Sequence, residues 1–159
     1  MNELRAVHES FEQEIIIEGD VMRYLARHRQ RHFWNLEAGG QLFGSISPQS
    51  ILISNISGPY PRDDRGPRHY RSHPQSAQTE IKRQQKLGHL YLGEWHSHAE
   101  KKPRASGDDN DAMQRLMRKS ALATNGLLLI ITGQHESGMG TSVYSHMDGA
   151  LREWDIVIT

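Results

Sequence analysis

The chain has 159 residues, of which 36% are hydrophobic, and its mean hydropathy is −0.70. This length gives room for about one hydrophobic core, so we expect a single domain over residues 1–159. The 19 basic and 19 acidic side chains leave a net charge of zero, which disfavours a role in binding nucleic acid or an anionic membrane surface.

Two further absences narrow the class of protein. There is no cysteine, which excludes disulfides and thiolate zinc sites and fits a reducing compartment. Residues 1–13 are mixed and charged rather than basic and then apolar, and no apolar run approaches the roughly 20 residues needed to span a bilayer. We therefore expect a cytoplasmic protein without a membrane segment, in which any metal is held by histidine or carboxylate groups.

The first half of the chain predicts a strand, a helix and a hairpin. A β-branched run at 14–18 indicates a strand. Apolar residues recur at helical spacing over 20–31, which indicates a helix. Residues 38–46 and 51–57 have the pattern of two strands joined by a turn around 48–50, so we expect them to form a hairpin.

The second half of the chain alternates helices and strands. The segment 58–75 contains four prolines, so we expect a long loop or an irregular edge strand there. Beyond it we expect, in chain order, a helix over 78–87, a strand over 90–97, a helix over 108–122, a strand over 127–132, and one or two more strands up to residue 159. The alternation predicts the α/β class with a mixed sheet.

Two histidines near the end of the predicted strand 90–97 have the spacing of a metal-binding pair. Because side chains alternate between the faces of a strand, His96 and His98 project from the same face, about 6–7 Å apart along the chain. Ser106 is placed to cap the following helix, and Asp109 lies in its first turn, where the helix dipole favours an ionised carboxylate. Two imidazoles and this carboxylate leave one tetrahedral position for water, the arrangement of a catalytic zinc site.

Simpler explanations exist for each of these residues. Ser106 with an acidic residue three positions later is also a variant of the helix capping box. Histidine occurs ten times in the chain, so chance pairs are not rare. Glu94 lies on the same strand face as the two histidines, and its spacing alone also allows it to be a ligand or a base. Asp108 is adjacent to Asp109, although the motif spacing selects the latter.

The whole pattern resembles the JAMM motif of the JAB/MPN metalloproteases. That motif is seen here as His96-x-His98, followed after seven residues by Ser106 and two residues later by Asp109. Upstream, Glu37 precedes a glycine-containing stretch, as in that family. The four-residue core is specific, the glutamate and glycine pattern supports it, and the resemblance covers most of the chain.

This resemblance implies the cytidine-deaminase-like JAB fold, a curved mixed β-sheet flanked by helices. It also implies a zinc metalloprotease with one zinc ion per chain, held by His96, His98 and Asp109, with Glu37 as general acid/base and Ser106 as donor to the oxyanion. These residue types suit amide hydrolysis, because zinc acidifies its bound water and a nearby carboxylate can carry the proton to the leaving amine.

Within the family, the chain is most similar to short, stand-alone bacterial JAB peptidases. These are encoded with ubiquitin-activating and conjugating-like enzymes in antiphage operons such as the CBASS systems. The supporting stretches are 57–59, 64–65, 68–70 and 91–95. The resemblance implies an (iso)peptidase that removes a ubiquitin-like protein or a conjugated nucleotidyltransferase-type enzyme from its target. The expected partner is thus a protein with an extended C-terminal tail, and neither nucleic acid nor a membrane.

The segment 58–75 offers a candidate surface for such a tail. It carries Arg62, Arg65, Arg68 and Arg71 against two aspartates. An extended tail could add alongside an exposed strand, with main-chain hydrogen bonds giving affinity and arginines meeting carboxylates or carbonyls. An ordinary solvated loop explains the same composition equally well.

Two other functions fit the same motif. A JAB peptidase that trims a sulfur-carrier protein in cofactor or amino-acid synthesis would share the fold and the chemistry. A non-catalytic MPN scaffold would only bind partners, but such domains usually lack the metal ligands that this chain retains.

Overall fold

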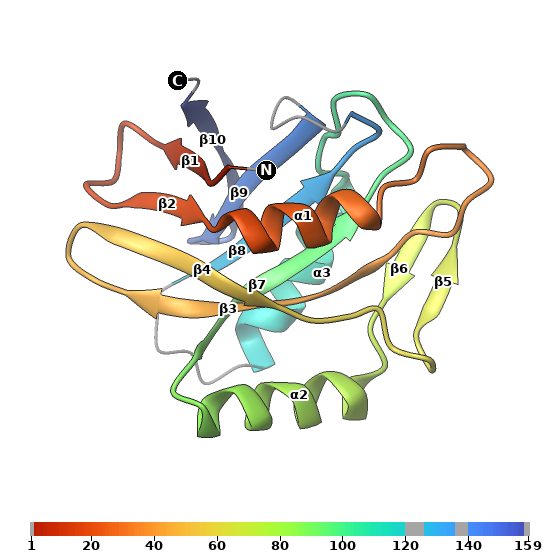
Figure 1. Ribbon diagram of the computed structural model, residues 1–159, viewed down its shortest axis with the longest axis horizontal. Coiled ribbons are helices and arrows are strands. Elements are labelled where there is room, and N and C mark those ends of the chain that lie inside the picture. Colours follow the sequence, from red (N-terminus) through yellow and green to blue (C-terminus); the bar gives the residue numbers. More distant parts are fainter. Residues whose placement is uncertain (1, 120–125, 136–139, 158–159) are drawn as a thin grey trace.

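The computed structural model describes residues 2–119, 126–135 and 140–157. Its helices are α1 (Gly19–Arg27), α2 (Pro74–Lys86) and α3 (Gly107–Lys119). Its strands are β1 (Leu4–Val7), β2 (Glu14–Ile17), β3 (Gly39–Ile46), β4 (Ser50–Ile56), β5 (Asp64–Gly66), β6 (His69–Arg71), β7 (Leu90–Ser97), β8 (Leu127–Thr132), β9 (Thr141–Met147) and β10 (Ala150–Val157). Figure 1 shows α1 in front of the main sheet and α3 behind it.

The main sheet curves until it closes. Its strand order is β1-β10-β9-β8-β7-β3-β4-β2, and β2 pairs again with β1. The pairs β2–β4 and β7–β8 are parallel, whereas the remaining pairs are antiparallel. The sheet is therefore mixed, as the sequence predicted, and β7 lies between β3 and β8.

The strand β8 is buried on both faces, which explains its continuous apolar sequence. On one face, Leu128 and Ile130 belong to the larger hydrophobic cluster, together with Trp95 of β7. On the other face, Leu129 packs in a second cluster with Met113 of α3. The helix α3, which carries the second half of the histidine motif, is therefore packed against β8, the strand next to the one that carries the histidines.

The helix α1 packs its apolar face into the larger cluster through Val21, Met22 and Leu25. The sequence predicted that this helix would continue to residue 31, but it ends at Arg27. It stops there because Gln30 leaves the helical path and makes buried side-chain hydrogen bonds. This early end creates the loop that leads into β3.

Two parts of the structure contain strands that the sequence patterns did not predict. The strand β1 lies in a charged segment, where buried Leu4 and Ala6 alternate with exposed residues. The strands β5 and β6 form a separate hairpin within the segment that was predicted to be a loop or an irregular edge strand. Strands this short gain their stability from their pairing partners rather than from their own composition.

The strands β7 and β8 have the predicted bounds, and the other remaining elements follow the predictions with shifted ends. The helix α2 begins at Pro74 rather than at 78, because proline suits the first turn and the His73 side chain accepts a hydrogen bond from the Ser76 N–H at 3.3 Å. The helix α3 begins at Gly107, and the predicted helical residues 120–122 lie outside the described residues. The last segment forms two strands, β9 and β10.

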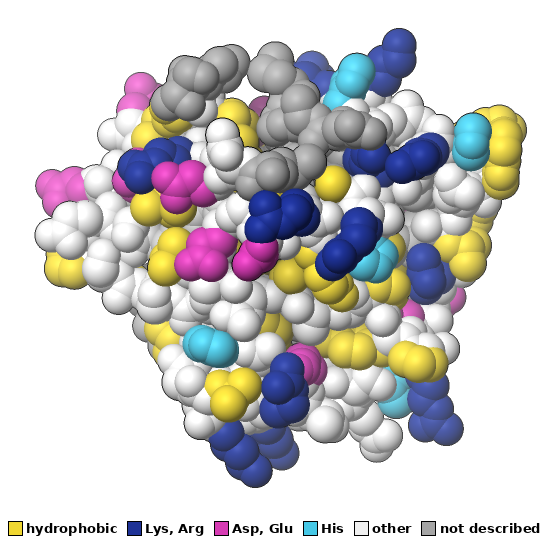
Figure 2. Space-filling view, in the orientation of Figure 1, with side chains coloured by type: hydrophobic (Ala, Val, Ile, Leu, Met, Phe, Trp, Pro, Cys, Tyr) yellow, Lys and Arg dark blue, Asp and Glu magenta, His cyan; other side chains and the backbone are white. Residues whose placement is uncertain are grey.

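Side chains of both charge signs lie over the face shown in Figure 2, as expected for a chain without net charge. Within the described ranges, no helix combines the length and apolarity needed to cross a lipid bilayer.

Candidate metal centre

The end of β7 places two imidazoles side by side. The backbone N–H of Ser97 donates to the carbonyl of Ala38 at 2.8 Å, and the N–H of His98 donates to the carbonyl of Thr132 at 2.9 Å. These bonds hold the end of the strand from both sides. The rings of His96 and His98 consequently lie on one face, with their centroids 4.8 Å apart.

The residues that alternate with the histidines face the interior. Trp95 is buried, and its indole N–H donates to the carbonyl of Ser57 at 2.8 Å. Ser97 is also buried, and its hydroxyl donates to Oε1 of Gln30 at 2.8 Å. Both bonds fix the rotation of β7 about its own axis, so that His96 faces the opposite side.

The first turn of α3 holds Ser106 and Asp109 in reciprocal hydrogen bonds. The N–H of Ser106 donates to Oδ2 of Asp109 at 2.7 Å, and the N–H of Asp109 donates to Oγ of Ser106 at 3.1 Å. This is the capping box that the spacing allowed. Because Oγ acts as an acceptor in it, the single hydroxyl hydrogen of the exposed Ser106 is not used by the cap.

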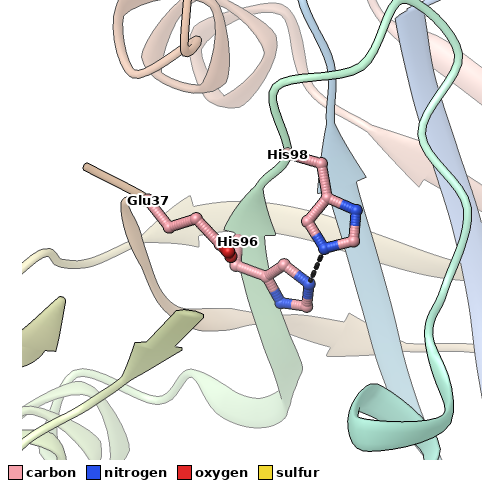
Figure 3. Close-up of side chains that lie close together, drawn as sticks. All are labelled: Glu37, His96 and His98. Atoms are coloured by element: carbon pink, nitrogen blue, oxygen red, sulfur yellow. Dashed lines mark hydrogen bonds between the residues drawn. The ribbon is translucent and has the colours of Figure 1, made fainter. Parts of the chain in front are cut away.

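The carboxylate of Asp109 reaches from α3 to both imidazoles. Its Oδ1 lies 3.1 Å from Nε2 of His96, and its Oδ2 lies 3.6 Å from Nε2 of His98. The two Nε2 atoms are 3.1 Å apart, and Figure 3 shows the rings turned toward each other. Ligand atoms around one tetrahedral zinc ion lie about 3.3 Å from one another, so these three groups fit such an ion.

The electrostatics favour the protonation states that bind a metal. Burial raises the pKa of Asp109, but the hydrogen bond and charge of His96 and the N–H of Ser106 outweigh burial and bring that pKa to about 2. Burial and the neighbouring His96 lower the pKa of His98. At neutral pH, Asp109 is therefore ionised and His98 is neutral, which are the forms that coordinate metals.

Glu37 joins this group from the loop before β3. Its carboxylate and the ring nitrogens of His96 and His98 lie within 4.8 Å of one another, and Figure 3 shows the three side chains together. Glu37 is 5% exposed, and burial raises its pKa to about 7, although His96 acts in the opposite direction. A carboxyl group with a pKa near the ambient pH is suited to accept a proton and return it.

The β5–β6 hairpin holds the backbone of Glu37. The N–H of Glu37 donates to the carbonyl of Gly66 at 2.8 Å, and Nε of Arg65 donates to the carbonyl of Glu37 at 2.7 Å. Arg65, one of the four arginines predicted to bind substrate, is half-buried and contacts the backbone of Glu37. The structure leaves the other three exposed on the surface: Arg62, Arg68 and Arg71.

Glu94, the alternative ligand or base, belongs to a different polar network. Its carboxylate accepts hydrogen bonds from the hydroxyl of Tyr91 and from Nε2 of Gln41. Burial raises the pKa of Glu94 to about 7, against the opposing effects of these two bonds and of His96. Both of its oxygens are engaged on β3 and β7, whereas the carboxylate of Glu37 lies with the two imidazoles.

Glu100, which no sequence pattern singled out, contacts the far side of a histidine ring. Its Oε1 lies 3.1 Å from Nδ1 of His98, the ring nitrogen that does not face Asp109. A carboxylate in this position orients the imidazole and increases its basicity as a ligand. The only signal in the sequence was an acidic residue two positions after a histidine, which is too common to be informative.

Gln30 is a second residue that sequence reasoning missed. Its buried amide accepts from Oγ of Ser97 and donates to the carbonyls of Asn35 and Pro67 at 2.8 and 3.1 Å. Oγ of Ser97 in turn accepts from the N–H of Ala38 at 2.9 Å. One side chain thus connects the loop before β3, the turn of the β5–β6 hairpin and the end of β7.

Known proteins share this fold. A solution structure of a protein from Desulfitobacterium hafniense matches with a TM-score of 0.61, covering 86% of this chain and 87% of that one. The sequence identity is 22%, so this likeness supports the fold alone.

Sequence relatives match over most of the chain. A protein from Escherichia coli (strain TW11681) is 30% identical over 146 residues, which cover 90% of both chains. A protein from Vibrio cholerae serotype O1 is 31% identical over 133 residues, or 79% of this chain and 80% of the relative. Both relatives are named CD-NTase/cGAS isopeptidase. The family model described as prokaryotic homologs of the JAB domain matches residues 19–153, and the chain with its curved mixed sheet therefore belongs to this family.

Proposed function

We propose that this protein is a zinc-dependent isopeptidase that hydrolyses the amide bond between the C-terminus of a CD-NTase and an amine of a target protein. The observation that carries the proposal is the convergence of Glu37, His96, His98 and Asp109 at one end of β7. The names of the two relatives support this reaction and favour a CD-NTase over a ubiquitin-like protein as the conjugated component. In the cell, the activity opposes the conjugating enzyme of an antiphage operon.

His96, His98 and Asp109 are the proposed ligands of one zinc ion. Asp109 is preferred to Glu37 as the third ligand because its oxygens lie close to both Nε2 atoms and because its pKa of about 2 keeps it ionised. Zinc bound there supplies a Lewis acid that acidifies a water molecule and polarises a carbonyl. Glu100 holds the ring of His98 by its other nitrogen.

Glu37 is the proposed general acid/base. Its carboxylate accepts a proton from the attacking water as the water oxygen bonds to the scissile carbonyl carbon. The same carboxyl group then gives that proton to the nitrogen of the leaving amine as the carbon–nitrogen bond breaks. A pKa of about 7 suits both transfers, and the products are a free C-terminal carboxyl group and a free amine.

Ser106 is the proposed donor to the carbonyl oxygen as negative charge develops on it. The hydroxyl is exposed, and its hydrogen is not used in the capping box with Asp109. The positive end of the α3 dipole lies at the same place and favours the same negative charge. Ser106 can therefore cap the helix and assist the reaction without a conflict between the two roles.

The β5–β6 hairpin is the proposed edge for the substrate tail. Gly66 of β5 contacts the backbone of Glu37, and in the described part of the chain β6 pairs only with β5. An extended tail can add along β6 through main-chain hydrogen bonds. The exposed Arg62, Arg68 and Arg71 are available to its carbonyl and carboxylate groups, whereas Arg65 positions Glu37.

The proposed function is tested with an intact conjugate. A CD-NTase joined through its C-terminus to a lysine of a second protein is incubated with zinc-loaded enzyme, and the products are identified by mass spectrometry. We expect the complete CD-NTase and the unmodified second protein, and no cleavage after zinc is chelated. A sulfur-carrier precursor serves as the comparison substrate. Cleavage of that precursor alone, or of neither substrate, would reject the proposed function.

A further inference from the structure

The loop between α1 and β3 exposes several large apolar side chains. Phe33, Trp34 and Leu36 are 74%, 59% and 49% exposed. Figure 2 shows hydrophobic side chains and a histidine at the upper right edge, where this loop lies in Figure 1. We call residues 31–36 the aromatic loop. Apolar side chains that cluster on a surface in this way mark a binding site.

The aromatic loop is held in one shape by its own contacts. The ring of Trp34 stacks on His32 with the centroids 4.4 Å apart, and Phe33 meets Trp34 edge-on at 5.1 Å. The N–H of His32 donates to Oδ1 of Asn35 at 2.9 Å, and Gln30 donates to the carbonyl of Asn35 at 2.8 Å. A loop that is already ordered loses little conformational entropy when a partner binds.

The aromatic loop leads directly into the reaction centre. Leu36 precedes Glu37 in the chain. The buried amide of Gln30 also ties the base of the loop to Ser97 of β7 and to Pro67 of the hairpin. A protein that docks on the loop therefore lies beside the bond that Glu37 is proposed to cleave.

Exposed arginines flank the aromatic loop. Between Asp20 and Glu37 the chain has four arginines and no acidic residue. Arg27 and Arg31 are exposed, and so is Arg68, which follows the proline that Gln30 contacts. The matching partner is a protein surface on which acidic side chains border an apolar patch.

We propose that the aromatic loop is the docking surface for the folded domain of the CD-NTase whose C-terminus forms the scissile bond. This inference rests on the proposed function and extends it from the substrate tail to the folded donor. Both relatives are named for the CD-NTase and not for its target, so the recognition surface beside the site is assigned to the CD-NTase. Trp34 is the expected anchor, because tryptophan is enriched among the residues that dominate binding energy.

The kinetic test compares two substrates that carry the same amide bond. One is a full-length CD-NTase conjugate, and the other is a peptide of its C-terminal tail joined to the same lysine. We expect Trp34→Ala to raise KM for the full-length conjugate by about tenfold or more, and to change KM and kcat for the peptide by less than about twofold. Leu87→Ala is the matched control, because Leu87 is also 59% exposed but lies at the end of α2. This control variant should leave KM and kcat unchanged for both substrates.

Equal losses on both substrates would show that Trp34 acts on the catalytic centre, and unchanged kinetics on both would show that the loop does not dock the donor. Either result overturns the proposal. A direct binding measurement distinguishes failure of the docking proposal from failure of the proposed isopeptidase function. Calorimetry with free CD-NTase should show binding to the wild-type protein. Trp34→Ala should weaken this binding about tenfold or more, and Arg31→Glu should also weaken it.

This binding should be found whether or not the conjugate is cleaved. Trp34-dependent binding without cleavage would reject the isopeptidase function and leave the docking surface intact. Absence of Trp34-dependent binding would reject the docking surface, even if the conjugate is cleaved. A single-stranded oligonucleotide is titrated in parallel, since arginines beside aromatic rings also suit nucleic acid. Salt-sensitive binding of the oligonucleotide through Trp34, with none of the CD-NTase, would overturn the inference.

Discussion

Nε2 of His96 lies 3.1 Å from Oδ1 of Asp109, which brings the end of β7 against the first turn of α3. Each residue is held there by contacts of its own element. The strand is hydrogen-bonded to both neighbours, and the helix is capped by Ser106 and packed through Met113. The fold itself therefore brings these two proposed ligand groups together, because these contacts do not depend on a metal.

Zinc content distinguishes two adjacent carboxylates. We expect about one zinc ion per chain in the purified wild-type protein, since the motif provides one set of ligands. Asp109→Asn should weaken zinc binding by more than about 100-fold, because it removes a charged ligand. Asp108→Asn is the control, since Asp108 is exposed in the same turn. Titration with a chromogenic chelator measures both variants, and equal zinc affinity in the two would show that Asp109 is not a ligand.

The role of Ser106 in the reaction can be separated from its role as a helix cap. Ser106→Ala should lower kcat by about 10²–10³ with little change in KM, because an oxyanion donor acts in the transition state. Loss of the cap should also cost about 1 kcal/mol of stability. Steady-state kinetics and chemical denaturation measure the two effects. A stability loss of this size with kcat reduced less than about threefold would assign Ser106 to capping alone.

Gln30 should act on both stability and rate. Gln30→Ala leaves the Asn35 and Pro67 carbonyls without this buried donor, so we expect a loss of about 2–4 kcal/mol in the free energy of unfolding. The exposed Gln85 of α2 provides the matched control, and Gln85→Ala should cost less than about 0.5 kcal/mol. If the variant folds with bound zinc, its kcat should fall because the loop before Glu37 loses its anchor. Equal stability of both variants would contradict this role.

The raised pKa of the half-buried Glu94 predicts a specific pH dependence of stability. Its folded-state pKa is about 7, above the ordinary value of 4.5, because burial disfavours the charged form. The stability associated with its protonated form is therefore fully present below pH 4.5 and is lost as the pH rises through about 7. Glu94→Gln stays neutral, so its stability relative to the wild type should increase between pH 5 and pH 8.5, on the order of 2 kcal/mol.

Chemical denaturation of both metal-free proteins across this range measures the difference. Glu37 and His98, whose pKa values are also shifted, are present in both proteins and largely cancel in the comparison. A difference in stability that stays constant from pH 5 to pH 8.5 would show that Glu94 titrates as an ordinary carboxyl group.

The sequence predicted the parts of the molecule in which local patterns carry the information. Alternation along 90–97 placed the two histidines on one face, and the apolar run 127–132 predicted a buried strand. The position of Ser106 at the start of a helix followed from capping chemistry. These features depend on neighbours in the chain, so they are visible without a structure.

The features that the sequence did not predict depend on contacts between distant segments of the chain. The strands β5 and β6 exist because they pair with each other and support the backbone of Glu37. The amide of Gln30 is informative only once Ser97 and Pro67 lie beside it. Arg65 stays a predicted substrate contact, and the structure adds a bond from its Nε to the carbonyl of Glu37, which the sequence did not indicate. No periodicity or spacing encodes these contacts.

Glu37 is proposed to carry the proton in amide hydrolysis and not to be a zinc ligand. The most direct test of this role measures zinc content and conjugate cleavage side by side for the wild type and Glu37→Gln. We predict one zinc ion per chain in both proteins and a cleavage rate in the variant that is lower by at least about 10²-fold. Near wild-type cleavage by zinc-loaded Glu37→Gln, or loss of zinc from this variant, would contradict the claim.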